Sequence, residues 1–175
     1  MKLIFLTQGY STQVSDYRYD YLMQWSWHVA ISKSGHMYAT RNVSKYESIL
    51  NKRTRLLMHH LIWKLMGNIL PPDKEIDHRD HNGLNNIDSN LREATALQNA
   101  ANKLKHKDNK SGYIGVIKRG DLKYEAFITY NYKRKFLGFY STKEMAARVR
   151  DYHAIKYYGE FASLNFEESR ELYKF

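Results

Sequence analysis

The sequence contains no cysteine. This absence excludes disulfide bonds, cysteine-based zinc sites and thiol nucleophiles. Long apolar runs are missing as well, because no stretch approaches the roughly 20 apolar residues that a membrane-spanning helix requires. The opening segment MKLIFLTQGY has too short an apolar run for a signal peptide, and it lacks a small-residue cleavage site. We therefore expect a soluble, intracellular protein with no membrane partner.

Acidic residues are scarce relative to basic ones, with 18 Asp and Glu against 28 Lys and Arg and a net charge of +10. Such an excess favours a polyanionic partner, and aromatic residues, which make up 14% of the chain, can stack on bases when they are mixed with cations. The alternative is that tyrosines fill small cores while lysines keep the surface soluble. The length of 175 residues accommodates one ordinary domain or two small ones.

The first part of the chain carries signals for short strands and helices. The expected elements are a strand at residues 2–7, a helix from Ser15 to Gln24, a hairpin of residues 27–31 and 36–41 around Ser34 and Gly35, and a helix over residues 56–66. Residues 73–102 follow two prolines. Their polar first half predicts a loop, and residues 94–104 predict a helix with Thr95 as its N-cap.

The second part changes pattern after the polar, basic stretch KLKHKDNKS, which predicts a linker. Three strand-like runs follow at residues 113–118, 124–130 and 133–140. A helix is expected to begin after Thr142 and to end near Gly159. A three-stranded antiparallel sheet needs such a helix to cover one face. We expect Tyr124, Ala126 and Ile128 to face the helix.

Residues suited to phosphodiester hydrolysis occur close together between residues 77 and 99. A histidine such as His78 can remove a proton from water near neutral pH. A hard divalent cation prefers oxygen ligands, which Asp77 and Asn99 can supply. In an extended backbone the neighbouring side chains of Asp77 and His78 point in opposite directions.

The stretch EIDHRDHNGLNNIDSNLREATALQNAAN resembles the ββα-metal (His-Me finger) site of the HNH homing endonucleases of phages and mobile introns. The resemblance implies that His78 is the general base and that Asn90 fixes the loop that orients it. It also implies one Mg²⁺ or Mn²⁺ ion per active site, bound by Asp77 and Asn99, and products with 5′-phosphate and 3′-hydroxyl ends. If it extends to a phage origin, the protein would act in the cytoplasm of a bacterial host.

The upstream segment LLMHHLIWKLMG is similar to a helix of the same family, with His59 at the matching histidine and His60 where the family carries arginine. Three alternatives stay open around the site. Asn85 and Asn86 are turn formers by type. Asn102, three residues after Asn99, is a rival metal ligand. A zinc cluster is a further alternative, formed by Asp77, His78, Asp80 and His81.

The segments SGYIGVIKRG, KYEAFITY and RKFLGFYSTKEMAARVRDYHAIKYYGEFASLNF resemble the DNA-binding domain of plant ethylene-response factors. That domain also occurs fused to phage HNH nucleases. The resemblance implies that the outward face of the sheet contacts the major groove, through Lys118, Arg119, Phe127, Thr129, Arg134 and Phe136. Ile114 and Ile117 replace arginines of the plant domains, so the recognition sequence does not transfer. The alternative is that these charges only solvate the sheet.

We therefore predict an α+β protein in which a ββα-metal nuclease domain precedes a small three-stranded antiparallel sheet with one helix. The expected divisions are a nuclease domain at residues 1–104, a basic linker at 105–111, a DNA-binding domain at 112–167 and a tail at 168–175. The expected function is metal-dependent, site-selective cleavage of double-stranded DNA. The alternative is a sequence-specific DNA-binding regulator without catalysis. Cutting both strands would take either a homodimer or sequential nicking, and the sequence leaves both open.

Overall fold

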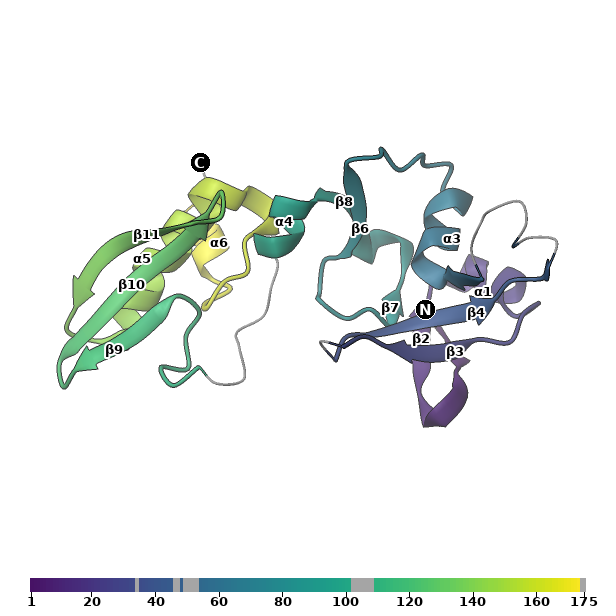
Figure 1. Ribbon diagram of the computed structural model, residues 1–175, viewed down its shortest axis with the longest axis horizontal. Coiled ribbons are helices and arrows are strands. Elements are labelled where there is room, and N and C mark those ends of the chain that lie inside the picture. Colours follow the sequence, from purple (N-terminus) through teal and green to yellow (C-terminus); the bar gives the residue numbers. More distant parts are fainter. Residues whose placement is uncertain (34, 46–47, 49–53, 102–108, 174–175) are drawn as a thin grey trace. The chain divides into compact units, whose positions relative to one another are not determined.

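The computed structural model describes residues 1–33, 35–45, 48, 54–101 and 109–173 (Figure 1). They form two compact units, Met1–Thr95 and Ala96–Phe175. Helices and strands occur in both units, so the expected mixture of α and β structure is confirmed. In the described part of the chain, no helix is long and apolar enough to cross a bilayer. Asn102 and most of the predicted linker lie outside the described residues.

Short strands dominate the first unit. They are β1 (Lys2–Phe5), β2 (Ser11–Val14), β3 (His28–Ile31), β4 (Met37–Asn42), β5 (Arg55–Leu57), β6 (Lys74–His78), β7 (Asn85–Asn86) and β8 (Leu91–Thr95). The helices are α1 (Asp16–Leu22) and α3 (Met58–Leu65), with the 3-10 turns η1 (Thr7–Gly9) and η2 (Asp88–Asn90). The described strands form small separate sheets in the orders β1-β2-β7, β3-β4-β5 and β6-β8.

The hairpin expected in the first unit is formed by β3 and β4. These strands pair antiparallel, with Ile31 opposite Met37, and Gly35 in the turn has a φ of 86°. Positive φ costs an L side chain steric energy that glycine avoids, which explains a glycine at this turn. Ser34 lies outside the described residues.

Strands include the first residues of two segments that the sequence pattern predicts as helical. Leu56 and Leu57 belong to β5 and pair with β4, so α3 begins at Met58. Ala94 and Thr95 belong to β8, so α4 begins at residue 96. The prediction of a loop over the first half of residues 73–102 was wrong in part, because strand β6 lies there and pairs antiparallel with β8.

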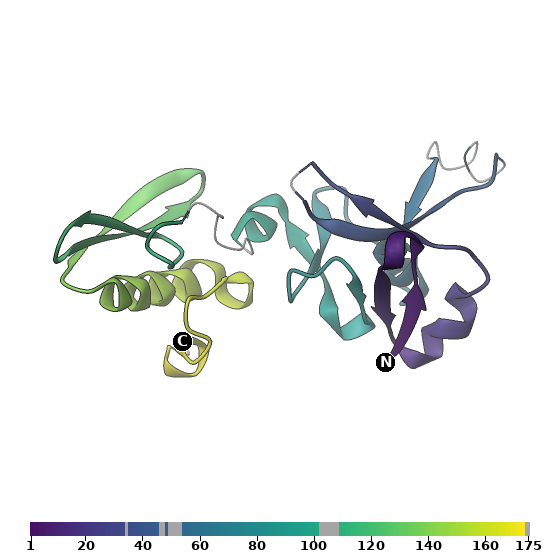
Figure 2. The same ribbon diagram turned by 90° about the horizontal axis from the view of Figure 1, so that it is seen from below.

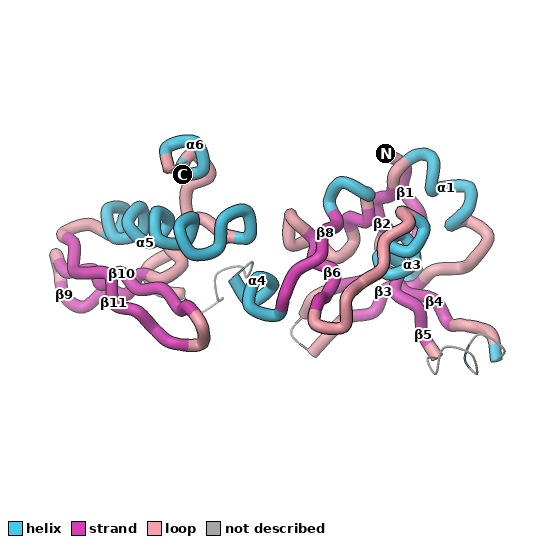
Figure 3. The backbone as a smooth tube through the Cα atoms, turned by 90° about the horizontal axis from the view of Figure 1, so that it is seen from above, coloured by secondary structure: helices cyan, strands magenta, loops and turns pink. Residues whose placement is uncertain are grey.

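One apolar core joins the small sheets of the first unit. Helix α3 contributes Met58 and Ile62, which are fully buried, and it packs against β4, β5, β6 and β7. Figure 3 shows α3 among the strands of this unit. The other buried members of the core are Ile4, Leu6, Val14, Leu22, Trp27, Val29, Ala39, Trp63, Leu84 and Leu91. Because α3 is anchored in this core, its remaining faces are fixed relative to the strands.

The second unit is a sheet covered by a helix. Its elements are α4 (Ala96–Ala101), β9 (Val116–Gly120), β10 (Lys123–Tyr130), β11 (Lys133–Tyr140), α5 (Lys143–Tyr158), the 3-10 turn η3 (Gly159–Phe161) and α6 (Ser169–Leu172). The strands pair antiparallel in the order β11-β10-β9. Figure 2 shows α5 lying along one face of this sheet.

The ends of α5 and the faces of β10 follow the sequence pattern. Thr142 Oγ1 accepts a hydrogen bond from Met145 N at 3.2 Å, and Gly159 ends the helix with a φ of 55°. Ala126 and Ile128 of β10 are buried beneath α5, where Ala146 and Ala154 pack against them. The residues between them on β10 face away from the helix.

Candidate active site and nucleic-acid interface

Asp77 and His78 form the end of strand β6, and both side chains are buried. The β6–β8 register places Arg92 opposite Asp77. Arg92 Nε donates to Asp77 Oδ2 at 2.9 Å, and its Nη2 lies 2.9 Å from the same oxygen. A buried, charge-assisted pair of this kind holds the orientation of its carboxylate. Arg92 is not identifiable as a site residue from the sequence alone, because its contact with Asp77 depends on the pairing of the two strands.

A chain of buried side chains holds the imidazole of His78. His78 Nε2 lies 3.3 Å from Asn86 Oδ1, and Asn86 Nδ2 donates to Thr12 Oγ1 at 2.8 Å. Thr12 Oγ1 donates in turn to the backbone carbonyl of Leu84 at 2.7 Å. Asn86 and Thr12 are both 0% exposed. Strand β2 therefore contributes to the site although Thr12 precedes Asn86 by 74 residues.

This chain determines which nitrogen of His78 carries a proton. The Thr12 hydroxyl hydrogen is committed to Leu84, so the Thr12 oxygen accepts from the amide nitrogen of Asn86. The carbonyl oxygen of Asn86 then faces His78 and can only accept. His78 Nε2 is therefore the protonated nitrogen, and Nδ1 bears the lone pair that can take up a proton.

The two adjacent asparagines serve different purposes. Asn85 behaves as its residue type predicts, because its Oδ1 accepts from Ile87 N at 3.4 Å within the turn. Asn86 differs from a simple turn former, because its side chain joins His78 to Thr12. No feature of the isolated sequence separates the two. Parallel pairing of β7 with β2 brings Asn86 opposite Val14, near Thr12.

Two aromatic rings, one from α3 and one from β4, lie beside His78. The ring of His59 meets that of His78 edge-on at 5.0 Å, and the Tyr38 ring lies 6.2 Å from His78. Burial lowers the pKa of His78, although the Asn86 hydrogen bond and nearby carboxylates oppose this. Burial, followed by the charges of His78 and His60, lowers the pKa of His59 well below its usual range. His78 is therefore neutral at neutral pH, which is the form that acts as a base.

A network of polar side chains closes the loop after His78. Asn90 Nδ2 donates to Asp80 Oδ1 at 2.9 Å and to the Asn85 carbonyl at 2.8 Å, while Asn90 Oδ1 accepts from Asp80 N at 3.2 Å. Asn85 Nδ2 also donates to Asp80, at 2.6 Å. Although burial raises the pKa of Asp80, these hydrogen bonds outweigh it and lower the pKa. Asn90 thus spans the loop that begins directly after His78.

Gly83 allows this loop to approach strand β4. A Cβ atom at Gly83 would lie 2.3 Å from the Met37 carbonyl oxygen and 2.7 Å from the Tyr38 ring. Both distances are shorter than van der Waals contact, so a side chain would push the loop away from Tyr38. Because Tyr38 also flanks His78, this close approach supports the geometry of the site.

Asp77, His78 and Asn90 all belong to the first unit, whereas Asn99 lies on α4, at the start of the second. The side chain of Asn99 is half-buried. Its convergence with Asp77 stays a prediction, and the rival ligand Asn102 lies outside the described residues.

Comparison with known proteins assigns the chain to a family. A sequence profile described as HNH endonuclease matches residues 56–101, the segment that contains α3, β6 and β8. A protein of Acanthamoeba polyphaga mimivirus, described as an uncharacterized HNH endonuclease, is 36% identical over 133 residues, which cover 70% of this chain and 68% of the relative. The chain belongs to the HNH endonuclease family. No solved structure gives a significant match to this endonuclease.

Family membership makes the chain an enzyme that hydrolyses DNA, and it decides against the alternative of a regulator without catalysis. It also places Asp77, His78, Asn90 and Asn99 within the matched segment. Thr12 lies outside the segment that the profile covers, so the hydrogen-bonded chain to His78 extends beyond it.

HNH nucleases generally use a divalent metal ion, and the residues present fit a hard cation with few protein ligands. Asp77 offers a carboxylate that Arg92 holds in place. Mg²⁺ typically binds through one or two protein ligands of this kind, together with water and substrate phosphate. In the part of the chain that the structure describes, no group of three or more Asp, Glu or His residues is arranged to hold a metal. The alternative zinc cluster around Asp77 and His81 is therefore not formed.

Five of the six residues predicted to contact DNA, Arg119, Phe127, Thr129, Arg134 and Phe136, lie on the face of the second unit's sheet that points away from α5. Register places Phe127 opposite Phe136 and Thr129 opposite Arg134. Arg134 lies over the Phe127 ring, 3.7 Å from its centroid. Phe136 is 59% exposed, an unusual state for so large an apolar ring. Lys118, on β9, differs from the prediction, because it lies opposite Tyr124, which packs toward α5. Its side chain is exposed, with Nζ 3.7 Å from Asp121.

A carboxylate that sequence analysis did not single out organises this face. Glu125 Oε2 accepts from Arg119 Nε at 2.7 Å, and Glu125 Oε1 accepts from Arg134 Nη2 at 2.6 Å. The two arginine side chains stay nearly half exposed. The hydrogen bond from Arg119, followed by the one from Arg134, holds the pKa of Glu125 below its usual value. Glu125 therefore fixes both guanidinium groups on the outer surface of the sheet.

A second exposed aromatic ring also belongs to this face. Phe139 is 50% exposed and meets the ring of Phe136 edge-on at 5.0 Å, while Lys123 Nζ lies 4.2 Å from the Phe139 ring centroid. Phe139 lies opposite Glu125 in the register of β10 and β11. Only knowledge of this strand pairing identifies it as part of the outward face. Exposed rings interleaved with cations are suited to stacking on bases or sugars.

Proposed function

We propose that this HNH endonuclease is a metal-dependent, site-selective nuclease of the homing type that cuts double-stranded DNA with His78 as general base. The observation that carries the proposal is the fixed tautomer of His78, in which Asn86 and Thr12 leave Nδ1 as the proton acceptor. Burial lowers the pKa of His78, so the base is neutral at the pH of the cell.

In this mechanism Nδ1 of His78 removes a proton from the attacking water as the oxygen approaches phosphorus. The resulting positive charge on the ring is stabilised by Asn86 Oδ1, which accepts from Nε2–H, and by the nearby charges of Asp80 and Asp77. Asn90 keeps the loop closed and so maintains the position of His78. The products would carry 5′-phosphate and 3′-hydroxyl ends.

Asp77 and Asn99 would hold one Mg²⁺ or Mn²⁺ ion, as the family resemblance implies. When bound, such an ion neutralises charge on the phosphate and on the leaving oxygen. The ion pair with Arg92 supports this role for Asp77, because a carboxylate fixed in advance loses less conformational freedom on binding a cation.

Site selection would come from the second unit. Its outward face carries Arg119, Phe127, Thr129, Arg134 and Phe136, as in the predicted likeness to the DNA-binding domain of ethylene-response factors. The arginines would contact bases or phosphates, and the exposed rings would pack against sugars and bases. The arrangement of Arg119 and Arg134 around Glu125 supports this role, because oriented guanidinium groups favour bidentate contacts.

Incubation with supercoiled plasmid tests the proposal directly. We expect nicked or linear DNA in the presence of Mg²⁺ or Mn²⁺ and intact DNA in EDTA. Cleavage that is equally fast in EDTA would contradict metal dependence. The ratio of nicked to linear product over a range of enzyme concentrations separates successive nicking from cleavage by a homodimer.

A further inference from the structure

We propose that the first unit has a DNA-binding face of its own, formed by Lys45, Arg55, His60 and Lys64. This face binds the phosphate backbone beside the scissile bond. The proposal rests on the DNA cleavage proposed above. It assigns backbone binding to a surface separate from the sheet of the second unit, and we refer to these four residues as the basic face.

The net charge of the chain is concentrated in the segment of sequence that contributes this surface. Residues 21–72 contain seven Lys and Arg residues and one acidic residue, so this segment carries more than half of the net charge of +10. Strands β4 and β5 and helix α3 contain no Asp or Glu. A surface with a single sign of charge attracts a polyanion over a distance of about 8 Å at physiological salt.

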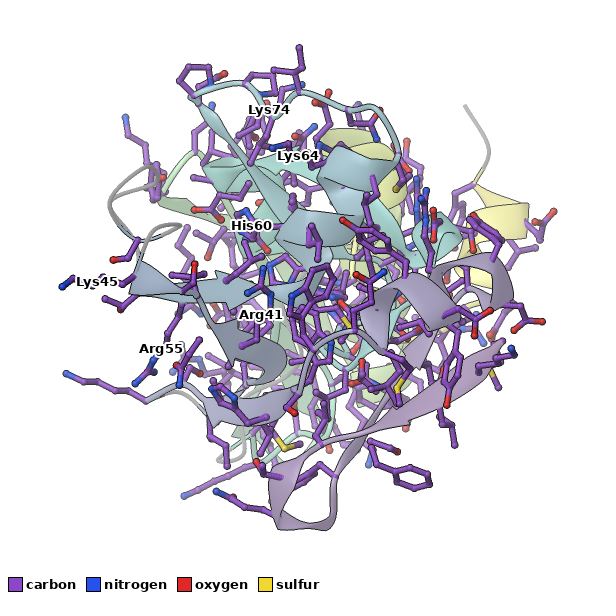
Figure 4. All side chains as sticks on the ribbon, turned by 90° about the vertical axis from the view of Figure 1, so that its right-hand side faces the viewer. Arg41, Lys45, Arg55, His60, Lys64 and Lys74 are labelled. Atoms are coloured by element: carbon purple, nitrogen blue, oxygen red, sulfur yellow. The ribbon has the colours of Figure 1, made fainter. Side chains whose placement is uncertain are left out.

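The elements that carry these cations pack against one another. Arg55 begins β5, which pairs with β4 so that Asn42 lies opposite it, and Lys45 follows β4 by three residues. The third residue of β5 is followed directly by α3, where His60 and Lys64 are four positions apart and share one side of the helix. Figure 4 shows these side chains along one side of the first unit, with Lys45 and Arg55 pointing outward.

Three residues of the basic face are exposed cations. Lys45, Arg55 and Lys64 are exposed and form no ion pair with any residue that the structure describes. Two other labelled cations differ from them. Lys74 is paired with Glu93 at 2.7 Å, and Arg41 is buried with its guanidinium over the Trp25 ring at 4.6 Å. Arg41 therefore adds positive charge beneath the surface without contacting a ligand.

Proximity to His78 identifies the occupant as DNA. His59 and His60 are neighbours on α3, with ring centroids 4.7 Å apart, and the His59 ring contacts His78. The basic face thus begins on the same helix that packs against the general base. A scissile phosphate at His78 would bring the next phosphates of the same strand, about 3.4 Å apart along the helix axis, close to His60 on this surface. An acidic protein or an anionic membrane would have no reason to lie beside the base.

The salt dependence of DNA binding tests the proposal in the full-length protein. Arg55→Gln/Lys64→Gln removes two charges from the basic face, and Lys2→Gln/Lys33→Gln removes two exposed charges elsewhere in the same unit. Dissociation constants for a duplex are measured in EDTA over a range of salt concentrations. Each phosphate contact contributes a slope of about 0.9 in a plot of log Kd against log salt.

We expect the slope of Arg55→Gln/Lys64→Gln to fall by about 1.8, and that of the control pair to stay at the wild-type value. Equal slopes for the two double variants would overturn the proposal. Plasmid cleavage by the wild type with Mg²⁺ is measured in parallel. Absence of cleavage would refute the proposed function while leaving the slopes to decide on the basic face.

Discussion

Asn86 and His78 are joined through Oδ1 and Nε2 at 3.3 Å, and both side chains are buried. Because Thr12 occupies the amide nitrogen of Asn86, the partners of the imidazole are set by atoms from β2, β6 and β7 together. The orientation of the proposed base is therefore a property of the folded first unit and not of the loop around His78 alone.

Substitution of Thr12 tests this arrangement. Thr12→Val keeps the shape of the side chain but leaves Asn86 Nδ2 without its buried acceptor, so Asn86 can rotate. We expect kcat to fall about tenfold, equivalent to ~1.4 kcal/mol, with little change in KM. Thr12→Ser retains the hydroxyl and should cleave nearly as fast as the wild type. Equal losses of kcat in both variants would contradict the positioning role.

The pH dependence of cleavage follows from the environment of His78. Burial lowers its pKa, so the neutral, proton-accepting form persists to lower pH than in an exposed histidine. Single-turnover cleavage should therefore rise with pH and level off below about 6.5, the usual pKa of histidine. A rate that is still rising steeply well above pH 7 would show that another group limits proton removal.

The stability of the first unit should depend on pH through His59. Its pKa in the folded state lies well below that of the unfolded chain, so the unfolded state binds more protons once the pH falls below about 6.5. The free energy of unfolding should then decrease with falling pH, by at most about 1.4 kcal/mol per pH unit for this group. Urea unfolding of His59→Phe should be less sensitive to pH than that of the wild type. The exposed His36, changed to Phe, provides the control.

The contribution of the Arg92–Asp77 ion pair to stability can be measured separately from its effect on cleavage. Arg92→Leu leaves the Asp77 carboxylate buried without its partner and should destabilise the fold by about 3–5 kcal/mol. Asp77→Leu/Arg92→Leu removes both charges and should recover most of that stability. Cleavage should be lost in both. A double variant that remains as unstable as Arg92→Leu would show that packing, not charge, explains the effect.

Glu125 provides a test of the second unit. Glu125→Gln removes the charge that neutralises Arg119 and Arg134, so both cations become available to phosphates. We expect tighter binding to random-sequence duplexes and a steeper salt dependence. Discrimination between the cleavage site and random DNA should fall, because the guanidinium groups are no longer held. Unchanged affinity and selectivity would indicate that this face does not contact DNA.

Several elements are predictable from the sequence because their signals are local. The β3–β4 hairpin follows from its turn, and α5 follows from Thr142 and Gly159 at its ends. The candidate residues Asp77 and His78 follow from residue chemistry and family resemblance. Their partners Arg92 and Thr12 do not, because each reaches the site through strand pairing between segments far apart in the sequence. Single-sequence patterns carry little information on such register.

The central claim is that His78 is the general base of a DNA-cleaving site. Its most direct test is the cleavage of supercoiled plasmid by wild type and His78→Ala in Mg²⁺, with duplex binding measured for both. We predict that His78→Ala binds DNA as tightly as the wild type and cleaves it about 10²–10⁴-fold more slowly. Cleavage by His78→Ala at the wild-type rate would contradict the account.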